Sequence, residues 1–336
     1  MSMPSFWIGV WAQPVESFAK WKQEGVNIVV KPDPSNNNTA EQRRAACAAA
    51  SLYYIDQPTD AADCAALVAD PWCYGVMYPD EASQDIVYPA SAAPKTGKIW
   101  YSADPAAWST AVALFNSTWN AILAPAKGVK AIFSNFPGGD VWGARPWNNG
   151  GECVPIAPLA TVVCQDTYPI NTNFAVDWTQ WNAGQGLPVS LTPNANPNVD
   201  PLAVGTTQSQ YGVRCLKSYF PGLPVWSYVE TCLFQTNPLG QQMTASLFNQ
   251  ETASLLKEGL SGLLYFTHNF NGPGWNPGAP AGQSNWDGRP ADVVAACIAL
   301  NAQLAGPVTP PPPTTPTLDQ RVSAIEQKLA AIKALL

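Results

Sequence analysis

The sequence predicts a (β/α)₈ barrel, and two observations carry that prediction. A unit made of a helical stretch, a glycine stop and a short apolar strand recurs along the chain, at 18–32, 121–135, 216–230 and 255–269. Links from helix to strand are short, whereas several links from strand to helix are long and rich in Pro, Gly, Asn and Trp. Alternating helices and buried strands are typical of a parallel sheet, and eight such units in about 300 residues fit a barrel.

The eight strands are expected in order along the chain, each as a continuous apolar run. They lie at 6–11, 27–31, 51–55, 72–78, 130–135, 161–168, 223–230 and 262–267. Helices are expected at about 15–24, 39–49, 60–69, 107–124, 205–219, 243–257 and 290–304. A glycine after a helix ends it because glycine tolerates the left-handed cap. No helix is readable after the fifth strand, so that helix is expected to be rudimentary.

An open doubly wound sheet is the alternative architecture for the same pattern. It commonly carries a GxGxxG or P-loop phosphate motif, and the sequence contains neither. The long strand-to-helix links all lie on one face of a barrel, where active sites of this fold are built. We therefore expect a TIM-barrel domain over residues 1–305.

Composition excludes several classes of protein. The net charge is −7 and only 17 residues are Lys or Arg, with no basic stripe, so nucleic acid is not an expected partner. No run of 18 apolar residues exists, so membrane insertion is not expected either. Residues 1–14 lack the basic and apolar regions of a signal peptide.

The single histidine, His268, restricts the available chemistry. A multi-histidine zinc site is impossible, no CxxC spacing exists, and no metal or cofactor is expected. Carboxylates, aromatic rings and amides must carry any reaction. The eight cysteines are scattered, so buried thiols are the default, with a disulfide involving Cys153 and Cys232 as the alternative.

Carboxylates follow two of the predicted strands. Asp80 and Glu81 follow the fourth strand, and Glu230 ends the seventh, across the mouth of the barrel. Cleavage of a glycosidic bond needs one protonated carboxyl group and one ionised one, and neither step needs histidine or metal. The alternative is structural: Glu81 caps the next helix and Glu230 pairs with a cation such as Lys31.

An acidic pair on strands four and seven of such a barrel resembles the clan A glycoside hydrolases. The resemblance covers residues 5–305 in layout and only short motifs in sequence. It implies that Glu81 is the acid/base, that Glu230 is the nucleophile, and that Tyr168 in "CQDTYPI" hydrogen-bonds the nucleophile. The clan usually has Asn before the acid/base. Here Asp80 stands at that place, and an ionised Asp can only accept hydrogen bonds.

Five further residues are candidates for substrate binding. Asn135 and Asp166 end strands five and six and could position sugar hydroxyls, or form ordinary loop hydrogen bonds. His268 ends strand eight and could line the cleft, or be a buried histidine bonded to the backbone. The aromatic residue that the clan often has after strand eight could be Phe270 or Trp275. We favour Trp275 as a sugar platform, although packing is the commoner role of tryptophan.

The C-terminal region is separate from the barrel. Residues 306–317 are proline-rich, and at about 3.1 Å per residue they would extend roughly 35 Å. In 318–336 apolar residues recur in a heptad pattern, with Leu or Val at a and Leu or Ile at d. This coiled-coil pattern disfavours a dimer, so we expect a homo-oligomer, most simply a trimer. The alternative is an amphipathic helix that docks on its own barrel.

These observations lead to two hypotheses of function. The first is a glycoside hydrolase, retaining, that cleaves a bacterial envelope polysaccharide. The second is a non-catalytic glycan-binding or structural protein on the same scaffold. The proline spacer and short oligomerising helix resemble phage tail-tip proteins, and the composition resembles that of actinobacteria and their phages. That resemblance implies a virion-associated or extracellular location with other tail proteins as partners; otherwise the location is cytoplasmic.

Overall fold

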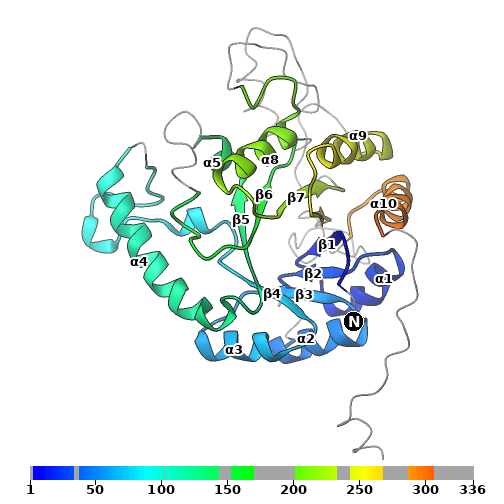
Figure 1. Ribbon diagram of the computed structural model, residues 1–336, viewed down its shortest axis with the longest axis horizontal. Helices are drawn as coiled ribbons and strands as arrows, with labels where there is room; N and C mark the ends of the chain where they lie inside the picture. The colour runs from blue at the N-terminus through cyan, green and yellow to red at the C-terminus, as the bar shows by residue number, and fades with distance from the viewer. Residues whose placement is uncertain are drawn as a thin grey trace, which may run out of the picture.

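The computed structural model describes residues 3–33, 38–101, 103–143, 153–169, 201–232, 243–267 and 287–305. Eight parallel strands close into a barrel in chain order, as Figure 1 shows. The strands are β1 (Trp7–Trp11), β2 (Ile28–Val30), β3 (Tyr53–Asp56), β4 (Cys73–Met77), β5 (Ala131–Pro137), β6 (Val162–Asp166), β7 (Val225–Glu230) and β8 (Gly262–Phe266). The closed barrel is therefore confirmed, and the doubly wound alternative is excluded.

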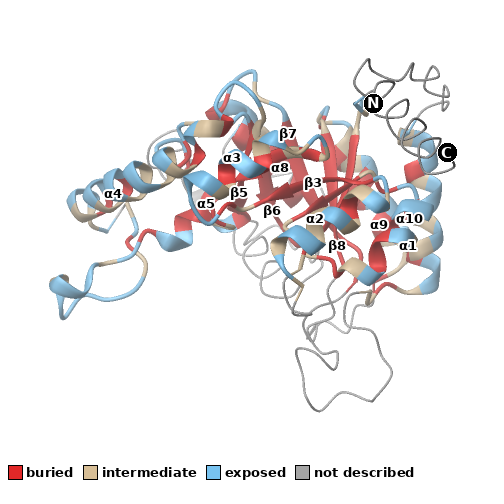
Figure 2. Cartoon of the chain, turned by 90° about the horizontal axis from the view of Figure 1, so that it is seen from below, coloured by how far each residue is buried: buried red, intermediate tan, exposed pale blue. Residues whose placement is uncertain are grey.

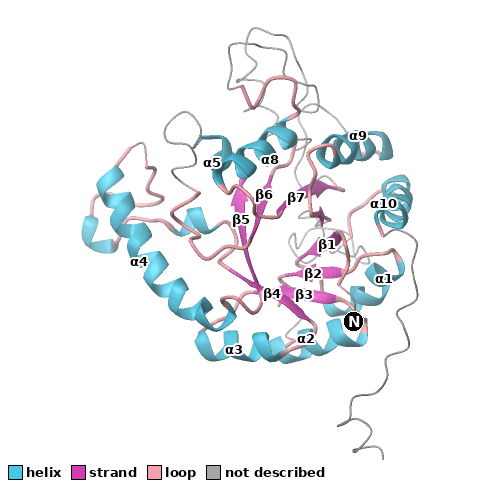
Figure 3. Ribbon diagram, in the orientation of Figure 1, coloured by secondary structure: helices cyan, strands magenta, loops and turns pink. Residues whose placement is uncertain are grey.

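Helices form a ring outside the strands (Figure 3). The described helices are α1 (Phe18–Gln23), α2 (Ala40–Ala49), α3 (Ala61–Ala69), α4 (Pro105–Leu123), α5 (Gly138–Gly143), α8 (Gln208–Tyr219), α9 (Ala245–Leu256) and α10 (Ala291–Leu304). Short 3₁₀ helices are η1 (Val15–Ser17), η2 (Ala82–Asp85), η3 (Ala90–Ala92) and η4 (Ala124–Ala126). The predicted rudimentary helix after strand five is α5, which has only six residues.

Side-chain caps fix where several helices begin. An Asp or Thr side chain accepts a backbone N–H of the first turn in five helices, at Thr39, Asp60, Asp104, Thr207 and Thr244. At α2 and α8 the glutamine three residues later also bonds back to the cap, which completes a capping box. These caps satisfy N–H groups that the helix itself leaves open.

The strands separate two apolar clusters. Side chains of alternate residues point into the barrel, where Trp7, Phe133 and Trp226 pack within 6.0 Å between ring centroids. The other residues face the helices and form the larger outer cluster. Figure 2 shows that buried residues concentrate on the strands and on the inner faces of the helices. Glycine makes room for the inner rings: a Cβ on Gly262 would lie 2.7 Å from Trp226.

One segment leaves the barrel between β4 and α4. We call residues 82–101 the β4–α4 arm. The arm contains η2 and η3 and is closed by an antiparallel bridge between Val87 and Lys98. In the view of Figure 2 the arm and α4 extend away from the strands. The arm begins directly after Glu81, so it forms part of the surroundings of the predicted site.

All eight cysteines lie in the described residues and are buried, and no disulfide bond links them. The interpretation as buried thiols is therefore confirmed, and the alternative disulfide involving Cys153 and Cys232 is wrong. Within the described part of the chain, no helix combines the length and apolar character needed to cross a membrane.

Candidate active site

Polar side chains from three neighbouring strands meet at the C-terminal mouth of the barrel. Asp80 follows β4, Asn135 lies in β5, and Asp166 ends β6. The Nδ2 of Asn135 lies 3.0 Å from Oδ1 of Asp80 and 3.4 Å from Oδ2 of Asp166. Asn135 is fully buried, so its amide links the two carboxyl groups away from bulk water. Three of the predicted site residues are therefore brought together.

Glu81 joins this cluster through Asp166, because a hydrogen bond connects the two carboxyl groups. Glu81 has a φ of +49°, a left-handed conformation that costs roughly 1–2 kcal/mol in a residue other than glycine. It precedes η2, but its side chain makes no capping hydrogen bond. The capping alternative for Glu81 is therefore excluded, and its backbone conformation directs the carboxyl group to the cluster instead.

The surroundings of Glu81 raise its pKa to about 7. Burial is the largest cause, and the negative charge of Asp80 is the second. The hydrogen bond from Asp166 and the positive charge of Lys98 oppose the shift, while Asp140 adds to it. A carboxyl group with this pKa carries a proton for much of the time at neutral pH, as a general acid requires.

Burial also raises the pKa of Asp80 and of Asp166. At Asp80 the hydrogen bond from Asn135 and the charge of Lys31 partly oppose burial. At Asp166 the charges of Glu81 and Asp80 reinforce burial, and its pKa lies well above the usual range. Burial and the two neighbouring negative charges therefore both favour the protonated form of Asp166.

Lys98 and Asp140 form the outer side of this cluster. The Nζ of Lys98 lies 2.6 Å and 2.7 Å from the two carboxylate oxygens of Asp140. The Ser83 hydroxyl also donates to Asp140. Since Lys98 is in the β4–α4 arm and Asp140 is in α5, this ion pair ties the arm to the barrel next to Glu81.

Glu230 ends β7 and is fully buried. It lies two and four residues after Tyr228 and Trp226, so it shares the face of β7 that carries these members of the inner cluster. The backbone N–H of Glu230 donates to the carboxyl group of Glu251 in α9, and burial together with the charge of Glu230 raises the pKa of Glu251. The rim position of Glu230 agrees with the predicted one. The distance between its carboxyl group and that of Glu81 stays a prediction.

Two tyrosines line the same mouth. The Tyr168 phenol donates a hydrogen bond to Asp166, and its ring centroid lies 6.2 Å from that of Tyr228. The predicted bond from Tyr168 to Glu230 stays a prediction. Tyr228 is 1% exposed, and the charges of Asp80 and Asp166 add to burial in raising its pKa. Sequence reasoning missed Tyr228, although its place two residues before Glu230 on a strand was a usable signal.

Three buried polar atoms of this cluster have no hydrogen-bond partner among the described residues. They are Oδ1 of Asn135, Oδ1 of Asp166 and the hydroxyl of Tyr228. Buried polar groups are normally hydrogen-bonded, so an unsatisfied set at the mouth of a barrel points to a ligand or to proton exchange within the cluster. A ligand rich in hydroxyl groups could both donate to these oxygens and accept from the tyrosine.

His268, Phe270 and Trp275 lie outside the described residues, as does the tail 306–336. No group of three or more His, Cys, Asp or Glu side chains within the described ranges has a geometry that could hold a metal ion.

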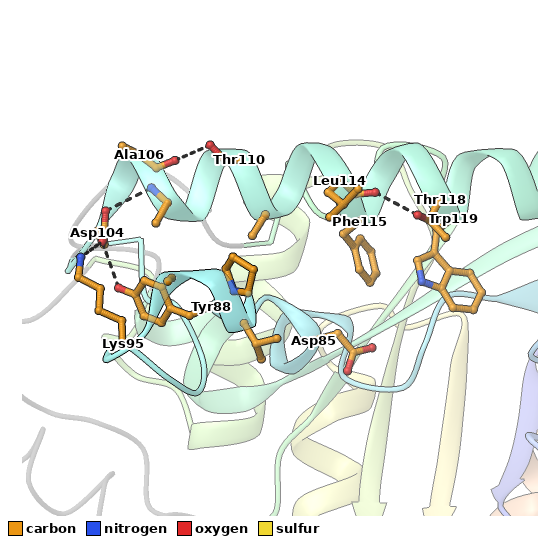
Figure 4. A pocket seen from close by; sticks show the side chains of 15 residues that line it. Asp85, Tyr88, Lys95, Asp104, Ala106, Thr110, Leu114, Phe115, Thr118 and Trp119 are labelled. Atoms are coloured by element: carbon orange, nitrogen blue, oxygen red, sulfur yellow. Dashed lines mark hydrogen bonds and ion pairs between the residues drawn. The ribbon is translucent and has the colours of Figure 1, made fainter.

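A hollow lies outside the barrel, between α4 and the β4–α4 arm (Figure 4). Its volume is about 660 Å³, within the usual range of roughly 300–1,000 Å³ for ligand sites. Apolar side chains such as Leu114, Phe115 and Trp119 line one wall, and Lys95 and Asp104 form an ion pair at one end. Tyr78, which follows β4, stacks on Phe115 at 6.3 Å, so this groove reaches the outer side of β4.

The fold and this site together define a closed parallel barrel with a buried carboxyl cluster at its C-terminal mouth. No protein-family model matches the chain, and a search of the curated proteins also gives no match. Among solved structures, the chain is similar to a β-galactosidase from the Antarctic haloarchaeon Halorubrum lacusprofundi, with 12% identity and a TM-score of 0.52. That match covers 89% of this chain and 58% of the other.

Two other structural neighbours are also glycoside hydrolases. An exo-β-1,4-mannosidase from Opitutaceae bacterium strain TAV5 has 14% identity and a TM-score of 0.46, over 89% of this chain and 60% of that one. A family GH53 catalytic domain from Ignisphaera aggregans has 13% identity and a TM-score of 0.48, over 88% and 96%. The chain thus spans less than two thirds of the first two proteins. The similarity to the β-galactosidase supports the barrel fold.

Proposed function

We propose that this protein is a glycoside hydrolase whose reaction takes place at the C-terminal mouth of the barrel. One observation carries the proposal: Glu81 is a carboxyl group with a pKa of about 7, inside a buried cluster of acids at the rim. A glycosidase needs a general acid of this kind, with a raised pKa. The structural neighbours named above are glycoside hydrolases, which agrees with this choice.

In this proposal Glu81 donates a proton to the departing glycosidic oxygen, and Glu230 attacks the anomeric carbon. The side chains of Asp80 and Asn135 contact the sugar. Asp166 and Tyr168 support the acids through hydrogen bonds, Asp166 to Glu81 and Tyr168 to Asp166. The partner-free atoms of Asn135 and Tyr228 are available to sugar hydroxyls. A retaining mechanism requires carboxyl groups about 5–5.5 Å apart, and about 6.5–9.5 Å would indicate an inverting one.

The test is hydrolysis of a panel of bacterial envelope polysaccharides, followed by the release of reducing ends. Glu81→Gln and Glu230→Gln keep the shape of each side chain and should lower turnover by orders of magnitude while sugar binding survives. Glu41→Gln, at an exposed position in α2, is the matched control and should match the wild type. If the wild type binds glycans and never releases product, the protein is a non-catalytic glycan-binding or structural module.

We further propose that residues 318–336 assemble the chain into a trimer and that His268 and Trp275 line the sugar cleft. The heptad pattern of 318–336 supports the trimer. The position of His268 and Trp275 after strand eight supports their place at the sugar. The setting that fits them is a phage tail with other virion proteins as neighbours. Truncation after Gly306 should reduce the mass found by light scattering to that of a monomer. An unchanged mass per particle would rule out this role of the tail.

A further inference from the structure

We propose that Asp166 is a positioning residue for Glu81, carrying a proton on Oδ1 and donating it in a hydrogen bond to the Glu81 carboxylate. The proposal rests on the proposed function, because it assigns the group that supports the general acid. It concerns the protonation of one side chain, so it can be tested with or without turnover.

The two oxygens of Asp166 have different surroundings. Oδ2 accepts from Nδ2 of Asn135 at 3.4 Å, and the Tyr168 phenol also donates to this carboxyl group. Oδ1 is buried and receives no hydrogen bond from the described residues. An acceptor left without a donor in the interior costs about 1–3 kcal/mol. That cost disappears if Oδ1 itself carries the proton and donates to Glu81.

The charges around the pair favour the same assignment. Glu81 and Asp166 both face Asp80, and Glu81 also faces Asp140. Of the two lysines that act on this cluster, Lys98 binds both oxygens of Asp140 and Lys31 acts on Asp80. Cys164 and Tyr228, which also face Asp166, are not cationic at neutral pH. Among the described residues these lysines are therefore shared with Asp140 and Asp80, and the charge of Lys98 that also acts on Glu81 does not neutralise a second ionised group at Asp166.

A neutral Asp166 has a direct use in the proposed reaction. When Glu81 gives up its proton, its O–H bond breaks and an O–H bond forms on the departing sugar, whose C–O bond electrons move to that oxygen. Glu81 is then a buried carboxylate. The O–H of Asp166 stabilises this anion by a hydrogen bond without transferring its own proton, so the pair holds two protons before the step and one after it.

The sharpest test compares Asp166→Asn with Asp166→Ala. Asparagine is neutral and can still donate to Glu81, so it should keep kcat/KM within a few-fold of the wild type and leave the alkaline limb of the pH profile in place. Alanine removes the donor. Since that hydrogen bond lowers the pKa of Glu81, the alkaline limb should move to higher pH and kcat should fall at least tenfold.

Asp60→Asn is the matched control, because asparagine caps a helix as well as aspartate does. Its kcat/KM and the alkaline limb of its pH profile should equal those of the wild type. If Asp166→Asn is as inactive as Asp166→Ala, Asp166 acts as a carboxylate and the proposal is wrong. If neither variant differs from the wild type, the proposal is equally wrong.

A second measurement needs no substrate. Infrared difference spectra at pH 8 should show the band of a protonated carboxyl group in the wild type that Asp166→Asn lacks. Absence of this difference overturns the proposal even for an active enzyme. Its presence supports the proposal even if no polysaccharide is hydrolysed, so the failure of the hydrolase assignment is distinguished from the failure of this one.

Discussion

The Nδ2 of Asn135 lies 3.0 Å from Oδ1 of Asp80, so a buried amide of β5 holds the carboxyl group that follows β4. The same amide reaches Asp166 on β6. One side chain thereby aligns the acids of two other strands. The spacing of the cluster depends on the closed sheet itself rather than on the loops above it.

Asn135→Asp replaces this donor by a further acceptor among acids. We expect the free energy of unfolding to fall by about 1–3 kcal/mol at neutral pH, because the hydrogen bond becomes a repulsion between buried oxygens. Urea denaturation measures the change. Asn249→Asp, at an exposed position of α9, is the matched control and should stay within about 0.5 kcal/mol of the wild type. Equal stability of the two variants would contradict the buried role of Asn135.

Loss of the Glu81 proton should end activity on substrates with poor leaving groups. Because its pKa is raised to about 7, kcat/KM should decline as the pH rises above about 7, when the acid form disappears. Glu81→Gln should abolish that limb and should harm aryl glycosides with good leaving groups far less than those with poor ones. Equal losses on both kinds of substrate would show that Glu81 does not protonate the leaving group.

Glu251 makes stability depend on pH. Burial raises its pKa well above the unfolded value of about 4.3, so the folded chain binds this proton more tightly. The resulting stabilisation is complete below about pH 4.3 and is lost as the pH rises through the folded pKa. Glutamine can still accept from Ser209 and from the N–H of Glu230 but cannot ionise.

We therefore expect Glu251→Gln to be more stable than the wild type at pH 8 and to have similar stability at pH 4. Urea denaturation at both values measures this, with Glu41→Gln as a control that should shift neither. A variant that loses stability at pH 8 would show that the ionised carboxylate is needed at this position.

Gly75 marks a close approach of two strands. A Cβ there would lie 2.6 Å from the backbone oxygen of Ala131, so β4 and β5 would have to move apart. Gly75→Ala should lower the free energy of unfolding by about 1–3 kcal/mol. Gly139→Ala is the control, since nothing lies within 4 Å of the added Cβ and alanine suits the short helix. Chemical denaturation measures the free energy of unfolding of both variants. An equal value for the two would contradict the close approach of β4 and β5 at Gly75.

Much of the fold was predictable because the strands of a barrel are continuous apolar runs. The observed strands begin and end within two residues of the predicted bounds, and the described helices within three. Helix α5 could not be read because it has six residues and begins with two glycines, which carry no amphipathic pattern. Asp80, Glu81 and Asp166 were predictable because each directly follows or ends an apolar run.

The rest of the site depends on contacts between distant parts of the chain. Lys98 comes from an arm of irregular structure, and Asp140 from a helix without a periodic pattern, so no local signal places them beside Glu81. The hydrogen bond between Glu81 and Asp166 likewise follows from a left-handed residue that sequence periodicity cannot reveal. Which acid holds a proton is decided by the balance of these neighbours, and that balance exists only in the folded barrel.

The β4–α4 arm also makes this barrel a convenient scaffold for insertion. The turn around Gly97 is exposed, and nothing lies within 4 Å of a Cβ placed there, while the Lys98–Asp140 ion pair anchors the base of the arm. Exposed loop tips are where domain insertion succeeds most often. A fluorescent module placed at this turn would leave all eight strands untouched and would report from one rim of the groove along α4. The same freedom allows evolution to lengthen or exchange the arm, and so to reshape the surface beside the carboxyl cluster, without rebuilding the barrel.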